Sequence, residues 1–564
     1  MYNIVELFSG IGSQAKALKN LGLEINTVGT CEWDVHAIAA YDLIHNSADI
    51  PEKIASMNKV QLLSELKHYT FSNTGKTPLD YDSLRTYSLA ALQRLYTSIT
   101  RNKNFVDVSS LTGDKLPEKI DILTYSFPCQ DLSNVGAFHG YNKGIDKNSG
   151  SRSSLLWQVG RILSEMNVAG KELPRFLLME NVPTLLSERH FANFSTWITD
   201  LSKLGYESKY YQLNASSFGL PQNRPRLLMI SVYVGNNPAT KEIVLDYFKE
   251  KNEADIIDDY VKSRFYHQFS VRDLLRIDYE NQGLFDEAVE CTPNNTVSRQ
   301  TIWDENPQIV LPGNVLNQNI NVVRTITTKQ DRNPNSGNLY FESGIAGKSN
   351  FRYLTPRECF LFMGFTDTDY QSLKDHNIEF HKGDALFSRD KVIRMAGNSI
   401  PVKLLEGIFL QILQIDTLLR DSNKHPHLDD TREIEAITSQ IRSFLFSRGI
   451  RNRVSGEYPV TADLIYPKYR TAIFIQDCFW HGHTCKSARL PDVNKQFWNN
   501  RVNRCIEEKK QHHQEAINLG WNAIVFWKCQ FWGNKYEKVL SQAEIIMREK
   551  GKNPNSPGEV YFLG

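Results

Sequence analysis

Cys129 is the residue of this sequence best suited to covalent chemistry. It ends the stretch Ser126-Phe127-Pro128-Cys129, which directly follows an apolar run at 120–125. A β-type run that ends in a Pro-Cys turn predicts an exposed thiol at a strand end, where open α/β sheets hold ligands and catalytic groups. Such a thiol is a candidate nucleophile, because thiolate is reactive even as a minor species near neutral pH. A lone cysteine is more often a small buried residue, so the hypothesis depends on partners elsewhere in the chain.

Three charged residues near predicted strand ends are candidate partners. Glu180 follows the apolar run at 175–179, and Arg224 and Arg226 precede the run at 227–234. A carboxylate at the end of a neighbouring strand is a second candidate catalytic group, although a lone one is more commonly a solvated loop residue. Two arginines that face the same way suit an anionic or carbonyl-bearing ligand, whereas surface arginines are the commoner case.

A glycine turn near the N-terminus indicates a nucleotide site. The β-type run at 2–8 is followed by Ser9-Gly10-Ile11-Gly12 and then by helical spacing. Strand, glycine-rich turn and helix form the unit in which a nucleotide approaches the backbone closely. Because the third glycine of the dinucleotide fingerprint is missing, an ordinary tight turn explains the motif equally well.

Two residues after the next apolar run favour the nucleotide interpretation. Glu32 lies about twenty residues after the glycine turn, where a carboxylate can hold a ribose hydroxyl pair. Trp33 beside it is suited to cover an adenine ring. Together they predict an adenosine-containing cofactor.

Three cysteines and a histidine near the C-terminus predict a metal site. Cys478, His483 and Cys485 lie close together in the sequence, and Cys529 follows later. Three thiolates and an imidazole form a closed tetrahedral zinc set, which leaves no open position for water and so indicates a structural site. The alternative is that these thiols are buried in a core.

The composition is that of an ordinary globular chain. With 564 residues it is too long for a single core, so about two to four domains are expected. Lys plus Arg (65) nearly balances Asp plus Glu (64), so the net charge does not support nucleic-acid binding, although it does not exclude local patches. No apolar run reaches membrane-span length, and the first residues lack a basic segment followed by an apolar one. These features and the sparse cysteines predict a soluble intracellular protein.

Several segments carry no motif. Residues 46–103 are rich in helix formers and predict a helical insertion of unknown role, and residues 105–108 resemble the end of a strand. The Gly/Ser/Lys-rich residues 139–153 are a candidate lid or a plain surface loop. A helix is expected at 401–420, followed by a polar linker at 421–427.

Taken in order, the motifs resemble those of the DNA cytosine methyltransferases that methylate ring carbon 5. The resemblance covers roughly residues 1–420, and six pieces in the family's order are highly specific where each alone is weak. The pieces are Leu7-Phe8-Ser9-Gly10-Ile11-Gly12, Phe127-Pro128-Cys129-Gln130, Glu180-Asn181-Val182, Gln222-x-Arg224-x-Arg226, Arg352-x-Leu354-Thr355-x-Arg357-Glu358 and Gly397-Asn398-Ser399. One departure is Ser126, where the family usually has glycine; serine is small enough that we expect no loss of function.

The resemblance implies a Rossmann-like, S-adenosylmethionine-dependent methyltransferase domain at 1–234 and 351–420, with a small target-recognition domain at 235–350. In the family, that small domain reads base edges in the major groove. The DNA sequence that is methylated does not follow from these residues.

The resemblance also implies catalytic roles. The Cys129 thiolate would add to carbon 6 of cytosine, and Glu180 would protonate or hydrogen-bond ring nitrogen 3. Arg226 would contact the base carbonyl, and Arg224 would help order the thiol and Glu180.

In the implied cofactor site, Glu32 would hold the ribose, Trp33 would lie against the adenine ring and Asp107 would lie near the adenine amino group. The remaining cofactor contacts by similarity are Phe8, Ser9, Gly10, Gly12, Val108, Pro128, Asn398 and Ser399. Because the target atom lies inside the duplex, the base must be flipped out. Gln130 and Ser133 would help hold the extruded strand.

The C-terminal part resembles the very-short-patch-repair endonucleases, which nick DNA at thymine:guanine mismatches. The shared pieces, over roughly residues 430–535, are Asp463 before Tyr466-Pro467-Lys468-Tyr469-Arg470, Cys478-Phe479-Trp480-His481, Phe497-Trp498, Leu519-Gly520-Trp521 and Trp527-Lys528-Cys529. They imply an α/β, restriction-endonuclease-like, zinc-containing domain at 431–564 after a linker at 421–430. By similarity, Asp463 would carry a catalytic metal, expected to be magnesium, and His481 would transfer a proton.

The nuclease set departs from the family pattern. The family's two acidic residues map near Thr438, with Glu435 a turn away, and at Lys509, beside Glu507 and Glu508. Ile475-Gln476, followed by Asp477, replaces a Thr-His pair. Three interpretations therefore stay open. The domain nicks mismatches, or it is a catalytically dead DNA-binding or structural module, or it is a restriction nuclease that uses Asp463 with Asp477.

The sequence as a whole predicts a monomeric DNA (cytosine-5-)-methyltransferase that acts on double-stranded DNA. We expect it in the cytoplasm of a bacterium or in a phage, in restriction-modification or DNA protection. The fusion is coherent, because 5-methylcytosine deaminates to thymine and so creates the lesion that the second domain would repair. A DNA-binding regulator with a dead methyltransferase fold is the alternative, which the presence of Cys129, Glu180 and both arginines disfavours.

Overall fold

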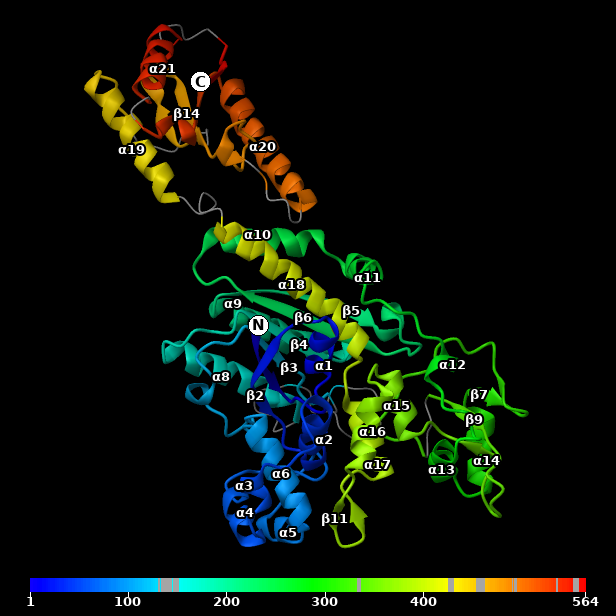
Figure 1. Cartoon of the computed structure of the whole chain (residues 1–564). Helices are drawn as coiled ribbons and strands as arrows, with labels where there is room; N and C mark the ends of the chain where they lie inside the picture. The colour runs from blue at the N-terminus through cyan, green and yellow to red at the C-terminus, as the bar shows by residue number, and fades with distance from the viewer. Residues whose placement is uncertain are drawn as a thin grey trace. The chain divides into compact units, whose positions relative to one another are not determined.

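The computed structural model divides the chain into two compact units (Figure 1). Unit 1 comprises Met1–Asn237 and Tyr247–Leu413, and unit 2 comprises Pro238–Asp246 and Gln414–Gly564. The residues that the structure describes are 1–129, 132, 145, 152–331, 336–424, 431–452, 462–488, 490, 495–533, 536–550 and 557–563.

Unit 1 is built on a six-stranded sheet with the order β2-β1-β3-β4-β6-β5. Its strands are β1 (Tyr2–Leu7), β2 (Ile25–Cys31), β3 (Ile122–Tyr125), β4 (Phe176–Asn181), β5 (Tyr206–Asn214) and β6 (Pro225–Tyr233). β2, β1, β3 and β4 run parallel, and β6 is antiparallel to both β4 and β5. The helices between them in the chain include α1 (Ser13–Asn20), α2 (Val35–His45), α8 (Leu156–Val168) and α9 (Glu188–Lys203). The predicted α/β class is confirmed, and the carboxyl ends of the parallel strands share the edge where such sheets bind ligands.

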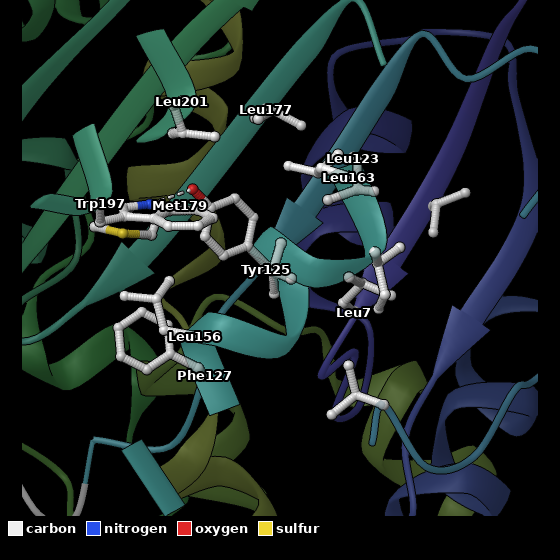
Figure 2. Packing of buried hydrophobic residues seen from close by; sticks show 14 of the residues in the cluster. Leu7, Leu123, Tyr125, Phe127, Leu156, Leu163, Leu177, Met179, Trp197 and Leu201 are labelled. Atoms are coloured by element: carbon white, nitrogen blue, oxygen red, sulfur yellow. Dashed lines mark hydrogen bonds between the residues drawn. The ribbon is translucent and has the colours of Figure 1, made fainter. Parts of the chain in front are cut away.

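The core between this sheet and helices α8 and α9 fixes the end of β3. Figure 2 shows Tyr125 and Phe127 among the buried side chains of β1, β4 and both helices. Trp197 Nε1 donates a hydrogen bond to the Tyr125 hydroxyl over 3.2 Å, and both side chains are buried. Burying a large apolar side chain contributes roughly 1.5–3 kcal/mol. This packing therefore holds the chain in one place immediately before Cys129.

The predicted helical insertion is confirmed. Its helices are α3 (Glu52–Ala55), α4 (Lys59–Leu66), α5 (Tyr81–Arg85) and α6 (Leu89–Arg101). Helix α6 buries Leu92, Leu95 and Ile99 on one face, as the spacing of an amphipathic helix predicts. The insertion also contacts the hairpin of β11 (Glu379–His381) and β12 (Asp384–Ala385), where the Ser88 N–H donates to the Phe380 carbonyl over 2.8 Å.

The predicted strand end at residues 105–108 is wrong. These residues form a loop in which Val106 has the left-handed φ of 66°. The Asn104 side-chain oxygen accepts hydrogen bonds from the N–H groups of Glu32 and Val106, over 3.0 and 2.9 Å. A side chain that bonds to nearby backbone in this way offers the chain an alternative to a strand ladder.

The chain after β6 contains a second sheet with the order β10-β9-β7-β8, and it also includes residues 238–246, which belong to unit 2. These strands are β7 (Gln308–Leu311), β8 (Val315–Leu316), β9 (Asn338–Tyr340) and β10 (Phe351–Arg352). The helices after β6 are α10 (Pro238–Glu250), α11 (Glu253–Val261), α12 (Val271–Leu274), α13 (Gln282–Glu290), α14 (Val297–Glu305), α15 (Pro356–Phe362), α16 (Asp367–Asp375), α17 (Arg389–Asn398) and α18 (Val402–Lys424). The predicted linker overlaps α18, because the chain has neither Gly nor Pro from residue 408 to residue 425 to end the helix.

Unit 2 has its own four-stranded sheet with the order β13-β14-β15-β16. The strands are β13 (Leu464–Tyr466), β14 (Thr471–Gln476), β15 (Asn522–Trp527) and β16 (Val560–Phe562), with helices α19 (Thr431–Ser447), α20 (Lys495–Asn518) and α21 (Tyr536–Lys550). β14, β15 and β16 are parallel, and β13 is antiparallel to β14. Ile441 and Leu445 of α19 pack with Ile473 and Phe526 of the sheet in one buried cluster. In neither unit does a helix of the described residues combine the length and apolar character of a membrane span.

Candidate active site and metal centre

Cys129, Glu180 and Arg226 lie at or after the ends of three neighbouring strands of the main sheet. Cys129 follows β3, Glu180 is on β4 and Arg226 is on β6, and β4 lies between the other two strands. Arg226 Nε donates to Glu180 Oε1 over 2.8 Å, and these side chains are only 11% and 12% exposed. Cys129 is half-buried. The fold thus brings a thiol, a carboxyl group and a guanidinium group to one edge of the sheet.

The surroundings raise the proton affinity of both acidic groups. Burial raises the pKa of the Cys129 thiol; Arg226 and Arg224 oppose this, whereas Glu180 adds to it. Burial also raises the pKa of the Glu180 carboxyl group, again against the two arginines. A carboxyl group that keeps its proton more readily is better suited to donate it to a ring nitrogen.

The turn that carries Cys129 is anchored on both sides. Asn181 Nδ2 donates to the Phe127 carbonyl over 3.0 Å, and Ser153 Oγ donates to the Pro128 carbonyl over 2.6 Å. Ser126 Oγ reaches the Phe8 carbonyl at 3.4 Å, which links the turn to the glycine loop. Gln130, Ser133 and most of the candidate lid at 139–153 lie outside the described residues.

Glu32 organises the glycine loop. Its carboxylate accepts hydrogen bonds from the N–H groups of Gly10 (3.0 Å), Trp33 (2.9 Å) and Asp34 (2.9 Å). Burial, together with the nearby Asp34, raises the pKa of Glu32 to about 7. Gly10 has a φ of 53°, and a methyl group placed on it would meet no atom within 4 Å. A backbone edge that borders open space next to a carboxylate suits a ribose with free hydroxyl groups.

The other predicted cofactor residues lie in the turns around these strand ends. Phe8 adopts the left-handed φ of 59°, and Gly12, at 79°, packs so closely that an added methyl group would lie 2.2 Å from His45 Nε2. Trp33 and Asp107 are half-buried and Val108 is buried. The predicted contacts Asn398 and Ser399 lie where α17 ends, and Ser9 and Pro128 lie in the two turns already described. The chemistry of this set fits an adenosine cofactor.

Unit 2 brings the four predicted metal ligands together. One ligand atom from each of Cys478, His483, Cys485 and Cys529 lies within 4.8 Å of the others. The His483 ring stacks on Trp527 with 4.4 Å between ring centroids, which fixes its orientation. Three sulfur atoms and one imidazole nitrogen at this spacing fit a tetrahedral zinc ion.

The predicted nuclease residues have other partners. Asp463 Oδ2 accepts the Ile475 N–H over 2.6 Å, and His481 Nδ1 lies 2.9 Å from the Asp477 carbonyl oxygen. Asp477 Oδ2 lies 3.5 Å from Lys528 Nζ, whose side chain is 2% exposed. Within the described residues, the Cys/His cluster is the one group of three or more side chains able to hold a metal ion. Among the described residues, Asp463 therefore belongs to no group of three or more metal-ligating side chains.

Comparison with known families shows the family to which the chain belongs. Residues 88–414 match the family of C-5 cytosine-specific DNA methylases, and residues 428–487 match the DNA mismatch endonuclease Vsr. The chain belongs to the C-5 cytosine-specific DNA methylases. This membership confirms the predicted resemblance and implies DNA as substrate and S-adenosylmethionine as methyl donor.

Individual relatives match either the methylase part or the Vsr-like part of the chain. The chain is 30% identical to the type II methyltransferase M2.ScrFI of Lactococcus lactis subsp. cremoris over 418 residues, 73% of this chain and 99% of the relative. It is also 30% identical to the orphan methyltransferase M.SssI of Spiroplasma monobiae, over 72% of this chain and 96% of the relative. The type II nicking enzyme V.XorIIP of Xanthomonas oryzae pv. oryzae is 34% identical over 93 residues, 16% of this chain and 67% of that enzyme. The methylase thus carries a Vsr-like C-terminal part.

Arg224 has a different environment in this methylase from the one the motif implied. Its guanidinium group donates to the backbone carbonyls of Ile326 (2.7 Å), Gly397 (2.8 Å) and Ser399 (2.8 Å), and the residue is 2% exposed. No hydrogen bond joins it to Cys129 or Glu180 in the described structure, so its charge reaches them only through space. Arg224 therefore ties the start of β6 to the turn after α17.

We expect Arg224→Met and Arg226→Met to act on different properties. Arg224→Met leaves three carbonyls without a donor, so the free energy of unfolding of unit 1 should fall by roughly 3–5 kcal/mol. Arg226→Met should cost only about 1 kcal/mol, because Glu180 can take up a proton instead, yet it should abolish methyl transfer. Urea unfolding and tritiated methyl incorporation measure the two effects. Equal stability losses in the two variants would contradict this division.

Other motif residues of the methylase hold the structure. Gln222 is fully buried, donates to the Phe362 carbonyl over 2.9 Å and accepts the Ile326 N–H over 3.0 Å. Arg352 and Glu358 form a completely buried ion pair at 2.7 Å, and Glu358 also caps α15. Their place in the family pattern gave no sign of whether they touch ligand or hold the fold, because buried ion pairs and catalytic pairs use the same residue types.

Proposed function

We propose that this methylase transfers a methyl group to carbon 5 of a cytosine that is flipped out of double-stranded DNA. The observation that carries the proposal is the set of Cys129, Glu180 and Arg226 on adjacent strand ends, with Arg226 bonded to Glu180 at 2.8 Å. These groups supply the nucleophile, the proton donor and the carbonyl contact that a cytosine ring requires.

The proposed chemistry begins at carbon 6. The Cys129 sulfur bonds to that carbon, and the electrons of the 5,6 double bond move through the ring toward nitrogen 3. Glu180 delivers a proton or a hydrogen bond there, and Arg226 binds the ring carbonyl, so charge is stabilised as it develops. Carbon 5 becomes nucleophilic and takes the methyl group that S-adenosylmethionine supplies when bound. A base then removes the carbon 5 proton, and the bond from carbon 6 to sulfur breaks.

The cofactor site in this proposal is the glycine loop and its surroundings. Glu32 would accept the ribose hydroxyl groups, Trp33 would lie against the adenine, and Asp107 would meet the adenine amino group. Phe8, Ser9, Gly10, Gly12, Val108, Pro128, Asn398 and Ser399 would complete the pocket. The open space beside Gly10 supports this assignment.

The test of this function is methylation-sensitive sequencing of DNA from cells that express the protein. We expect methylated cytosine at one short sequence, which would also reveal the target read by residues 235–350. Unmodified DNA would favour a regulator with an inactive methyltransferase fold. Because relatives named as type II methyltransferases match the chain, we place the activity in restriction-modification or DNA protection in a bacterial cytoplasm or a phage, with the protein acting as a monomer.

We propose mismatch nicking as the second function, carried by the match of residues 428–487 to the Vsr family. Asp463 would hold magnesium and His481 would transfer the proton. The alternative in which Asp477 binds a metal is disfavoured, because Asp477 Oδ1 already accepts the N–H groups of Phe479 and Trp480 over 2.8 and 3.1 Å. The buried Lys528, which also pairs with Glu433, lies 3.5 Å from Asp477 Oδ2.

Nicking should depend on Asp463 and not on Asp477. We expect the purified protein with magnesium to nick a thymine:guanine duplex, Asp463→Ala to lose about 100-fold or more of that rate, and Asp477→Asn to keep most of it. A denaturing gel of end-labelled duplex measures each strand. An intact duplex with the wild-type protein would favour the dead binding module, and loss with Asp477→Asn would favour the restriction-nuclease alternative.

A further inference from the structure

The helical insertion at 46–103 joins the turn that carries the proposed cofactor residues. The Ser72 N–H donates to the Trp33 carbonyl over 2.8 Å, and the Val35 N–H donates to the Ser72 carbonyl over 3.0 Å. Asp34 and Ser72 form an isolated parallel bridge. The insertion therefore extends the backbone hydrogen bonding of the turn that follows Glu32.

Arg394, which belongs to a third segment of the chain, hydrogen-bonds to both the turn and the insertion. Its Nη2 atom donates to Asp34 Oδ2 over 2.8 Å and to the Asn73 carbonyl over 3.0 Å. The side chains of Arg394 and Asp34 are 20% and 10% exposed. Arg394 lies on α17, which ends at Asn398. One guanidinium group thus ties the turn after Glu32, the insertion and the helix that leads to the other proposed wall of the cofactor pocket.

Asp34 connects Arg394 to Glu32, because it forms hydrogen bonds with both residues. Its N–H donates to Glu32 Oε1 over 2.9 Å, and its own Oδ1 accepts the His36 N–H over 3.0 Å at the start of α2. A shift of Asp34 would therefore move both the carboxylate proposed to hold the ribose and the first turn of α2. Ionic hydrogen bonds are stronger than neutral ones and hold geometry more tightly.

We propose that Arg394 is a positioning residue for the cofactor site, and that the insertion acts as a brace which holds the Glu32–Trp33 turn against α17. The inference rests on the proposed binding of S-adenosylmethionine at this turn. Arg394 does not touch the reacting atoms in this proposal; it acts through Asp34 and Asn73.

The role predicts a selective loss of cofactor affinity. Arg394→Met keeps a long side chain but removes both hydrogen bonds and the charge. We expect the dissociation constant for S-adenosylmethionine to rise about tenfold or more, since one hydrogen bond to a charged group contributes about that factor. The dissociation constant for a cytosine-containing duplex should change by less than about twofold. Isothermal titration with S-adenosylmethionine and fluorescence anisotropy with labelled duplex measure the two constants.

A second substitution separates positioning from plain stability. Arg394→Met leaves the Asp34 carboxylate buried without its cation, which lowers stability. Asp34→Asn removes that charge and keeps an oxygen for the cap of α2. In the double variant we expect the melting temperature to recover while the affinity for S-adenosylmethionine stays low. Recovery of both would overturn the inference, because it would show that Arg394 only balances a buried charge.

The matched control is Arg389→Met on the same helix. Arg389 pairs with Asp390 and donates to the Glu290 carbonyl, so its loss should leave the affinity for S-adenosylmethionine unchanged. If Arg394→Met does not fold, Arg394→Lys keeps the charge with a single donor group and should weaken binding severalfold; wild-type affinity in either variant would overturn the inference. A wild-type protein that does not bind S-adenosylmethionine would contradict the proposed function itself.

Discussion

Replacement of Cys129 by serine is expected to abolish DNA methylation, with a loss of about 10⁴-fold or more in the rate of methyl transfer. A serine hydroxyl has the same place in the turn but is a far weaker nucleophile, because its proton is lost only at much higher pH. Without the bond from sulfur to carbon 6, carbon 5 does not become nucleophilic. Tritiated methyl incorporation into DNA measures the loss.

The binding sites should survive this substitution. The Cys129 turn is held by the hydrogen bonds of Asn181 and Ser153 to backbone carbonyls, and neither contact uses the sulfur. We therefore expect affinities for S-adenosylmethionine and for duplex DNA within about threefold of wild type. The matched control is Cys505→Ser, a half-buried cysteine on α20 outside the described metal cluster, which should methylate normally. Methylation by Cys129→Ser at more than a few per cent of the normal rate would refute the covalent mechanism.

A trapped adduct provides an independent measurement of the same bond. In a duplex with 5-fluorocytosine at the target, carbon 5 carries fluorine instead of a proton, and fluorine does not leave as a cation. The adduct between sulfur and carbon 6 should persist after methyl transfer and survive a denaturing gel. We expect the slow-migrating band with the wild-type protein and its absence with Cys129→Ser.

The candidate active site could be predicted from sequence to the extent that its residues follow strands. Cys129 and Glu180 come directly after or at the ends of short apolar runs, and parallel strands place such positions at a common edge. Arg224 and Arg226 show the limit of this reasoning. Their spacing indicates the same face, yet Arg226 pairs with Glu180 while Arg224 binds carbonyls of residues 326, 397 and 399. Partners so distant in the chain leave no local signal.

The same limit applies to the brace around the cofactor turn. Arg394 and Asp34 are separated by 360 positions, and Arg394 and Asn73 by 321. Helix formers predicted the insertion as helical, but its role depends on a loop that meets another loop. The mistaken strand end at 105–108 has a similar cause, because the Asn104 side chain replaces strand pairing with local bonds. Only at residues 105–108 is local β-propensity overridden, and one of the Asn104 bonds there reaches Glu32, 72 positions away.

The Cys/His cluster depends on a short motif, which the sequence shows, and on the pairing register of two strands, which the sequence does not show. Cys478, His483 and Cys485 belong to one short segment, whereas Cys529 follows the neighbouring parallel strand β15. Gln476 of β14 pairs with Trp527 of β15, and each of the two cysteines follows its strand end by two residues. Equal offsets from a shared register bring the sulfur atoms of Cys478 and Cys529 to the same edge. The spacing of the motif predicts these residues as metal ligands, and strand pairing explains why they meet.

Loss of one metal ligand is therefore expected to unfold unit 2 while unit 1 stays folded. Structural zinc contributes roughly 10–16 kcal/mol of apparent binding free energy, which is as large as the roughly 5–15 kcal/mol that stabilises a whole domain. Cys529→Ser should reduce bound zinc from about one per chain to near zero, since three ligands hold the ion far more weakly than four. The cluster Ile441, Leu445, Ile473 and Phe526 would then lose the strand ends that frame it. Atomic absorption measures the zinc, and limited proteolysis measures the folded fraction of each unit.

Three comparisons test whether this loss is specific to the metal site. Cys505→Ser changes the same residue type in the same unit but outside the described cluster, so it should keep both zinc and protease resistance. Methyl transfer by Cys529→Ser should stay within about twofold of normal, because every residue of the proposed methylation site lies in unit 1. A chelator should reproduce the substitution in the wild-type protein, with cleavage confined to unit 2. Full zinc content in Cys529→Ser would remove Cys529 from the ligand set, and a protease-resistant unit 2 without zinc would show that its hydrophobic core is stable without the metal.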